Sequence, residues 1–205
     1  MSGAIPSEQF RLFIAVTLPE GVRTKIEEAQ AVLRRAVPDS AVRWARRDQF
    51  HITLRFLGNV DACLVEPLAE AVQGACRGFA AFRLRAEGIG FFPNARAPRV
   101  IWAGVNDRQN LLPRLQHAVE AGVRNFTGEE TEGKFIGHVT LSRIKGLSRA
   151  ETEVAGRLVS GMTQAFFGEW TASNVEVIRS VLSPAGARYV TLGTVALAAD
   201  KASCE

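Results

Sequence analysis

The sequence has no apolar run that could cross a membrane. Stretches such as residues 12–16 are far shorter than the roughly 18 residues that a membrane-spanning helix needs. No N-terminal segment combines a basic start, an apolar stretch and a small-residue cleavage site. We therefore expect a cytoplasmic protein without a membrane segment.

Cysteine is scarce as well. Cys63, Cys76 and Cys204 form no CxxC pair, and their odd number leaves at least one thiol unpaired. Because disulfide frameworks and zinc ribbons need paired, closely spaced cysteines, the sequence argues against both.

The charge balance has no strong bias of either sign. The 25 basic and 21 acidic residues leave a net charge of +4, which permits an anionic partner without requiring one. Hydrophobic residues make up 47% of the 205 residues and no low-complexity linker divides them. We expect a monomer with no obligate protein partner, formed by one domain over 1–205 of two packed lobes, with a loose tail at 198–205.

The apolar pattern predicts an α+β protein with antiparallel hairpins. Apolar positions at helical spacing predict helices, and β-rich runs bounded by Gly or Pro predict strands. Asp61 is the expected N-cap of the second helix. The predicted strands are 11–18, 51–57, 82–86, 99–105, 135–144, 174–182 and 188–197, and the predicted helices are 21–36, 61–76, 107–125 and 150–166.

Histidine is the most informative scarcity, because two of only three histidines share one pattern. His51 is followed by Thr53 and His138 by Thr140, each on a predicted strand and each after a predicted helix. Fewer than about one chain in a hundred would show two such placements by chance. The repeated block, 21–57 and 107–144, predicts an internal duplication around a pseudo-two-fold axis.

Two histidines with two hydroxyls suit phosphodiester hydrolysis. One neutral imidazole can accept a proton from water while a protonated one donates to the leaving oxygen. Side chains alternate along a strand, so Thr53 and Thr140 face the same way as His51 and His138 and can donate to phosphate oxygens.

A metal site is the rival use of these histidines. Catalytic zinc normally has three protein ligands, and neither pattern carries an Asp, Glu or Cys that would complete one. His117 lies at a helical position between Gln116 and Ala118, and we interpret it as a surface residue. The sequence therefore favours chemistry without a metal or another cofactor.

The chain resembles the two-histidine (2H) phosphoesterase superfamily, and within it the bacterial and archaeal RNA 2′,3′-cyclic phosphodiesterases. The resemblance covers about residues 10–197. Its segments are 11–16, 42–44 followed by 50–58, 92–102, 138–143 and 180–189. Family members often have Pro before the second His, where this chain has Gly137, which we expect to loosen the backbone there.

The resemblance implies a bilobal α+β fold, with two antiparallel sheets and outer helices related by a pseudo-two-fold axis and an active-site cleft between the lobes. It implies a metal-independent hydrolysis of RNA ends or small nucleotides that carry a 2′,3′-cyclic phosphate. His51 would be the general acid and His138 the general base, and the product would be a 2′-phosphate. The residues alone do not distinguish the two roles.

The resemblance also implies that Phe56 and Arg143, each five residues after a His, contact substrate. Strict alternation places both on the face opposite the histidines, so this role requires each strand to end or bulge first, as Gly58 and Gly146 would allow. Otherwise Phe56 is a core residue and Arg143 a solvated charge.

Two further functions remain open. The same site run in reverse would join tRNA-like fragments through a 2′-5′ linkage, although excess water favours hydrolysis. Alternatively, the chain is a non-catalytic RNA-binding module. The pairs Arg46–Arg47 and Arg96–Arg99 could guide an RNA backbone, or could be ordinary surface charges.

Overall fold

A computed structural model describes residues 8–128, 133–184 and 186–199. The helices are α1 Glu20–Ala36, α2 Val65–Cys76, α3 Leu111–Gly122 and α4 Arg149–Gly161. The strands are β1 Gln9–Thr17, β2 Val42–Trp44, β3 His51–Asp61, β4 Phe82–Phe92, β5 Val100–Asn106, β6 His138–Ile144, β7 Phe166–Ala172, β8 Asn174–Ser183 and β9 Gly186–Ala196. No helix of this described part is long and apolar enough to cross a membrane.

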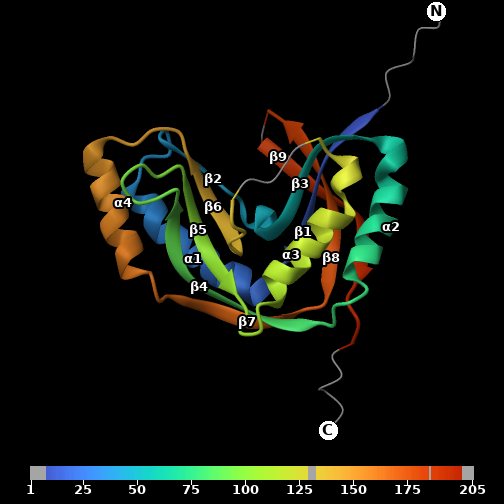
Figure 1. Cartoon of the computed structure of the whole chain (residues 1–205). Helices are drawn as coiled ribbons and strands as arrows, with labels where there is room; N and C mark the ends of the chain where they lie inside the picture. The colour runs from blue at the N-terminus through green and yellow to red at the C-terminus, as the bar shows by residue number, and fades with distance from the viewer. Residues whose placement is uncertain (1–7, 129–132, 185, 200–205) are drawn as a thin grey trace, which may run out of the picture.

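The strands form one curled antiparallel sheet made of two halves. Its order is β7-β4-β5-β6-β3-β1-β8-β9, and β2 pairs with the end of β6. The halves meet where β6 pairs with β3, in a register that places Ile52 opposite Val139. The predicted α+β architecture with two antiparallel lobes is confirmed, with the difference that this contact makes the two sheets continuous (Figure 1).

The helices cover the outside of the sheet in two pairs. α1 packs with α4, and α2 packs with α3, on opposite sides of the molecule (Figure 1). One helix of each pair crosses to the other half, because α1 follows β1 but contacts β7, whereas α3 follows β5 but contacts β3. The order β1-α1-β3-α2 therefore recurs as β5-α3-β6-α4, in agreement with a pseudo-two-fold arrangement.

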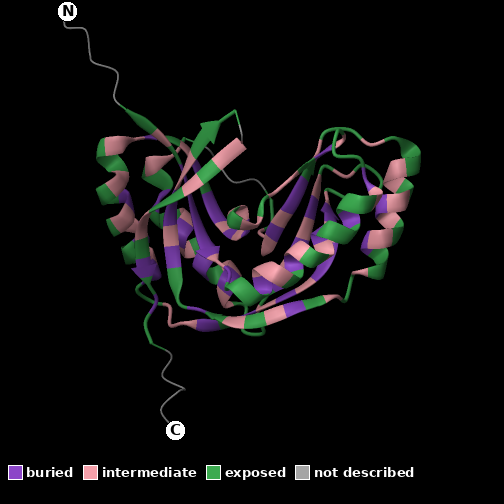
Figure 2. Cartoon of the chain, turned by 180° about the vertical axis from the view of Figure 1, so that it is seen from behind, coloured by how far each residue is buried: buried purple, intermediate pink, exposed green. Residues whose placement is uncertain are grey.

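One apolar core runs through both halves between the sheet and the helices. Its most buried large side chains include Ile14 and Ile52 from one half and Ile101 and Leu141 from the other. Seen from behind, the buried segments lie along the strands and on the helix faces that contact them (Figure 2). Burial of this shared core stabilises the contact between the two halves.

Several predicted boundaries are wrong. The helix predicted over 150–166 ends at Gly161, and the strand β7 that follows it was not predicted. β3 continues through Gly58 to Asp61, whose side chain accepts a hydrogen bond from Gln9 and does not cap a helix. β4 likewise continues to Phe92, because the backbone bulges at Gly88 (φ +72°) without ending the strand.

The C-terminal segment is partly described. Ala198 accepts a hydrogen bond from the Ala81 N–H and donates one to the Phe79 carbonyl, so this residue is paired with the rest of the fold. The remainder of the tail predicted at 198–205 lies outside the described residues from position 200 onward.

Gly137, immediately before β6, lies closer to its neighbours than any side chain would allow. A Cβ atom there would be 2.4 Å from the Val105 carbonyl oxygen and 2.7 Å from Leu112 Cδ2. The Gly137 carbonyl accepts a hydrogen bond from the Val105 N–H. The expectation that this glycine loosens the backbone is therefore wrong, because it allows β6 to begin in close contact with β5 and α3.

We predict that Gly137→Ala lowers the free energy of unfolding by about 1–3 kcal/mol, because backbone and core atoms would have to move. Urea unfolding followed by circular dichroism measures this difference. Gly146→Ala is the matched control, since nothing lies within 4 Å of its Cβ position, and it should change stability by less than about 0.5 kcal/mol. Equal effects of the two substitutions would contradict the packing argument.

Candidate active site

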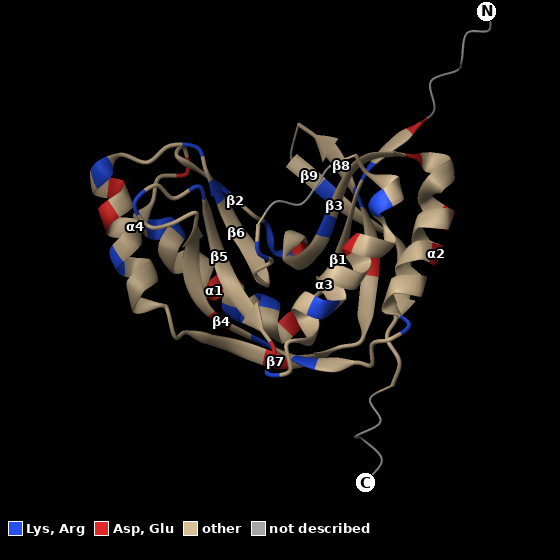
Figure 3. Ribbon diagram, viewed as in Figure 1, with Lys and Arg blue, Asp and Glu red and all other residues tan. Residues whose placement is uncertain are grey.

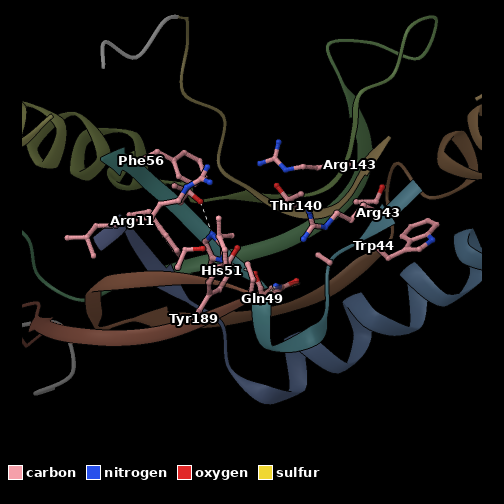
Figure 4. Close-up of a pocket in the computed structure, with 17 residues that line it drawn as sticks. Arg11, Arg43, Trp44, Gln49, His51, Phe56, Thr140, Arg143 and Tyr189 are labelled. Atoms are coloured by element: carbon pink, nitrogen blue, oxygen red, sulfur yellow. Dashed lines mark hydrogen bonds between the residues drawn. The ribbon is translucent and has the colours of Figure 1, made fainter. Parts of the chain in front are cut away.

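A cavity of ≈ 210 Å³ opens where the two halves meet. Strands of both halves contribute to it, and the close-up shows their side chains converging on one open space (Figure 4). The predicted residues His51, Thr53, Phe56, Thr140 and Arg143 all line it. The other lining residues are Arg11, Leu12, Phe13, Arg43, Trp44, Ala45, Gln49, Ser142, Ser180, Leu182, Ala187 and Tyr189.

The contact between β3 and β6 brings the two His-x-Thr patterns together. With Ile52 opposite Val139, an antiparallel register aligns His51 with Thr140 and Thr53 with His138. His138 is not among the lining residues, and its ring stands edge-on to Phe92, with 5.0 Å between ring centroids. It is nevertheless close enough to His51 for the two rings to interact electrostatically.

Both imidazole rings are oriented by the same backbone contact. His51 Nδ1 lies 2.6 Å from the Gln49 carbonyl oxygen and His138 Nδ1 lies 2.8 Å from the Ile136 carbonyl oxygen, in each case two residues earlier. A carbonyl only accepts, so Nδ1 carries the proton and Nε2 of the neutral ring is an acceptor. At His51 this Nε2 lies 2.9 Å from the Thr53 hydroxyl, which donates to it.

Burial makes both histidines weak bases in the free protein. Desolvation lowers the pKa of His51 from 6.5 to about 4, with smaller contributions from the charges of His138 and Arg23. Phe13 and Tyr189 pack against this ring, with centroids at 4.7 and 5.3 Å. Desolvation also lowers the pKa of His138, and the nearby Arg143 charge adds to the effect. Both rings are therefore neutral near pH 7 in the absence of an anion.

Two matched β-bulges place Phe56 and Arg143 on the face of the histidines. The β1–β3 register shifts between Thr53 and Arg55, and the β5–β6 register shifts between Thr140 and Ser142. Each shift reverses the alternation before the next side chain, so Phe56 and Arg143 are both exposed toward the cavity. The required bulges are thus confirmed and lie at Leu54 and Leu141, before Phe56 and Arg143. A second shift of the β1–β3 register, between Phe56 and Gly58, comes after Phe56, and Gly146 lies beyond the end of β6.

The rest of the structure supports both bulges. The extra residue sends Arg55 to the helix side of the sheet, where it is 7% exposed and lies 3.6 Å from a Glu120 carboxylate oxygen on α3. In the other half the Leu141 carbonyl accepts hydrogen bonds from the Ala45 N–H and from the buried Gln30 side chain of α1. Each bulge is therefore connected to the helix that crosses over from the other half.

The lining residues that were not predicted from the sequence include three with charged or phenolic side chains: Arg11, Arg43 and Tyr189. Arg11 and Phe13 alternate on β1, whose pairing with β3 places Phe13 opposite Phe56 and Arg11 opposite Asn59, on the cavity face of the sheet. Arg43 on β2 lies directly opposite Arg143 on β6. Tyr189 belongs to the closing hairpin, and no local pattern marks it as part of a site.

The site is cationic. Arg11, Arg43 and Arg143 line the cavity, no carboxylate appears among its described lining residues, and all three charges act on Tyr189. Within the described residues no group of three or more His, Cys, Asp or Glu side chains could hold a metal ion. His117 is exposed on α3, as predicted. The arrangement can hold an anion beside two imidazole nitrogen atoms.

We predict that His51 in the free protein titrates with a midpoint near pH 4, because burial disfavours its charged form. Saturating sulfate, an anion that does not titrate in this range, should raise this midpoint by compensating the imidazolium charge. Ring 15N chemical shifts measured between pH 3 and 8 test both points, with His51→Asn used for assignment. A midpoint at or above 6.5 in the free protein would contradict the burial argument.

Comparisons with known proteins identify relatives along most of the chain. The family model described as LigT like Phosphoesterase matches residues 16–102, which contain the first His-x-Thr pattern. A protein of Methanothermobacter thermautotrophicus named RNA 2′,3′-cyclic phosphodiesterase is 31% identical, and the match covers 89% of this chain and 96% of the relative. A protein of the same name from Thermus thermophilus is 33% identical, with 89% and 87% covered.

Solved structures of similar proteins superpose on most of this chain. The crystal structure of TT0787 of Thermus thermophilus superposes with a TM-score of 0.74 at 31% identity, covering 93% of this chain and 99% of that one. The structure of Escherichia coli LigT complexed with 3′-AMP has a TM-score of 0.71 with the same coverage, but at 24% identity it shows the shared fold alone. From the identity along nearly the whole length of its relatives, this chain belongs to the family of LigT-like phosphoesterases.

Proposed function

We propose that this protein hydrolyses 2′,3′-cyclic phosphate ends of RNA to 2′-phosphates, with His51 and His138 as the paired acid and base and without a metal ion. The observation that carries the proposal is the symmetric pairing at β3 and β6, where each ring has its Nδ1 proton bound to a carbonyl. Both Nε2 atoms are thereby available for proton transfer. The relatives named RNA 2′,3′-cyclic phosphodiesterase support the substrate.

The reaction uses one proton acceptor and one proton donor. A water molecule attacks phosphorus and forms a new P–O bond while its proton passes to His138 Nε2. The P–O3′ bond breaks, and His51 donates its Nε2 proton to the 3′-oxygen. Thr53 and Thr140 donate hydrogen bonds to the non-bridging oxygens, where negative charge grows. This assignment of acid and base follows the family resemblance.

The low pKa of His51 in the free protein is compatible with its role as the acid, because the bound substrate raises this pKa. In the free protein the ring is neutral and Thr53 donates to it. A bound phosphate diester places negative charge beside the ring and raises the pKa of His51, so its protonated form accumulates together with the substrate. The Thr53 hydroxyl, which can no longer donate to a protonated nitrogen, is then free to donate to phosphate. Protonation of His51 and hydrogen bonding of Thr53 to the phosphate are therefore coupled, because the Thr53 hydroxyl can donate to only one of the two partners.

We predict that His51→Ala and His138→Ala each lower kcat for adenosine 2′,3′-cyclic phosphate by about 10²–10⁴-fold, the usual contribution of a general acid or base. The assay is chromatographic and is run with excess EDTA, and the product is identified as the 2′- or 3′-phosphate. His117→Ala is the matched control because this His is exposed on α3, and it should retain wild-type turnover.

Three outcomes would contradict parts of the proposal. Loss of wild-type activity in EDTA would exclude the metal-free mechanism. Full activity of either His variant would remove that residue from the reaction. Absence of turnover with unchanged RNA affinity in the variants would favour a non-catalytic binding module.

We further predict that Phe56→Ala raises KM more than it lowers kcat. Its ring is 49% exposed at the cavity and lies 5.9 Å from the Phe13 ring, so it offers an apolar face on which a nucleobase can stack. Stacking of this kind contributes about 1–3 kcal/mol per base, which corresponds to roughly 5–150-fold in KM. Phe56→Trp should restore binding, and a variant that changes kcat alone would contradict a stacking role. Phe166→Ala, a similarly exposed Phe on β7, is the control.

A further inference from the structure

A second groove adjoins the active-site cavity at Arg143, which lines both. This groove has a volume of ≈ 670 Å³ and runs between the segment before β5 and the segment that joins β6 to α4. Its lining contains Pro98, Arg99, Val100, Arg143, Ile144, Lys145, Gly146, Leu147 and Thr152. The Arg143 side chain therefore borders both the cavity and the groove.

The cavity alone is too small for an RNA strand. Pockets that enclose small ligands usually measure about 300–1,000 Å³, and the cavity has only ≈ 210 Å³. It can take the cyclic phosphate and its ribose, with the base against exposed side chains at the rim. The nucleotides on the 5′ side of the terminal one must lie elsewhere on the surface.

The groove carries positive charge that no carboxylate in the described part of the chain neutralises. Arg99, Arg143 and Lys145 are exposed, and within the described residues none of them forms an ion pair. Strand pairing aligns them, because Arg143 lies opposite Arg43 on one side and opposite Val100, next to Arg99, on the other. Figure 3 shows Lys and Arg in the upper part of the lobe that carries β2, β6 and α4.

A neighbouring groove provides a contrast in the same lobe. It has a volume of ≈ 510 Å³, lies between α1 and β2, and likewise contains three basic residues, all of them Arg. Each of these is paired: Arg34 with Asp39, Arg46 with Asp48, and Arg47 with Glu20 and Glu27. Like charges directly opposite each other, as Arg43 and Arg143 are, destabilise a sheet unless an anion lies between them. Both grooves share lining residues with the cavity, Trp44 and Ala45 in this case and Arg143 in the other. Only the groove at Arg143 leaves its charges without an ion pair among the described residues.

We propose that the groove at Arg99, Arg143 and Lys145 binds the phosphodiester backbone of the RNA on the 5′ side of the terminal nucleotide. This inference rests on the proposed function and adds to it that the preferred substrate is an oligonucleotide end rather than a mononucleotide. Because the contacts are to phosphates, the groove reads the chain without regard to base sequence.

The test compares two substrates, adenosine 2′,3′-cyclic phosphate and a short oligoribonucleotide that ends in the same group. For the wild type, KM should be at least roughly tenfold lower for the oligonucleotide. The two phosphate contacts of Arg99 and Lys145 should together contribute a roughly sevenfold rise of this KM between 50 and 200 mM salt. The variant Arg99→Gln/Lys145→Gln should bring the ratio of the two KM values close to one and flatten the salt dependence.

Two controls make the result specific. Arg34→Gln/Arg35→Gln removes the same net charge from exposed positions on α1 and should leave the KM ratio at the wild-type value. An oligonucleotide with neutral methylphosphonate linkages next to the terminal nucleotide should behave like the mononucleotide with the wild type. The KM of this neutral oligonucleotide should then be the same for Arg99→Gln/Lys145→Gln as for the wild type.

The proposal would be overturned by a wild-type KM ratio near one, by an unchanged ratio in Arg99→Gln/Lys145→Gln, or by an equal loss in the α1 control. Failure of the proposed function is distinguishable, because it would abolish turnover of both substrates in the wild type. In that case fluorescence anisotropy with a labelled 3′-phosphorylated oligonucleotide still tests the groove. A roughly tenfold higher Kd for Arg99→Gln/Lys145→Gln, with no change for Arg34→Gln/Arg35→Gln, would support RNA binding by the groove.

Discussion

The pairing of β3 with β6 at Ile52 and Val139 is the contact on which the rest of the molecule depends. It is short, and alone it could not hold two lobes together. The crossing helices and the shared apolar core supply the missing stability, since α1 and α3 each pack against the half to which they do not belong in sequence. The consequence is that His51 and His138, 87 residues apart in the chain, are held in one register. A shift of one strand by one residue at this contact would turn its histidine away from the other histidine and toward the core.

The matched bulges show how a duplicated strand can carry both a core and a site. Without them, the positions five residues after each His would point toward the helices, and the cavity would lose Phe56 and Arg143. Each bulge leaves one polar group on the helix side of the sheet that needs a partner. Glu120 lies beside the Arg55 guanidinium, and Gln30 donates a hydrogen bond to the Leu141 carbonyl. The helices that join the halves therefore also stabilise the irregularities that form the site.

The sequence was sufficient to predict the histidine and threonine pairs, because they depend only on residue type, spacing and strand alternation. It was also sufficient to show that Phe56 and Arg143 need a bulge. It could not place that bulge, since Leu54 and Leu141 look like ordinary core positions and their neighbours Gly58 and Gly146 carry the stronger local signal. Arg43 and Tyr189 were missed for a different reason, because only the pairing of β2 with β6 and of β8 with β9 brings them to the cavity. β7 was missed because Phe166 continued an apolar helical pattern that in fact ends at Gly161.

The electrostatics of the site make sense only with an anion present. Burial lowers the pKa of both histidines, two arginines oppose each other across β2 and β6, and no carboxylate appears among the described residues that line the cavity. Each of these features destabilises the free protein, and stability given up at a binding site is a common cost of function. A phosphate diester reverses all three at once, because its negative charge stabilises an imidazolium, lies between the guanidinium groups and accepts from the threonine hydroxyls. In the proposed reaction, the charge that holds the substrate also favours the protonated form of the acid, so a site with two neutral histidines in the free protein would acquire its acid on binding.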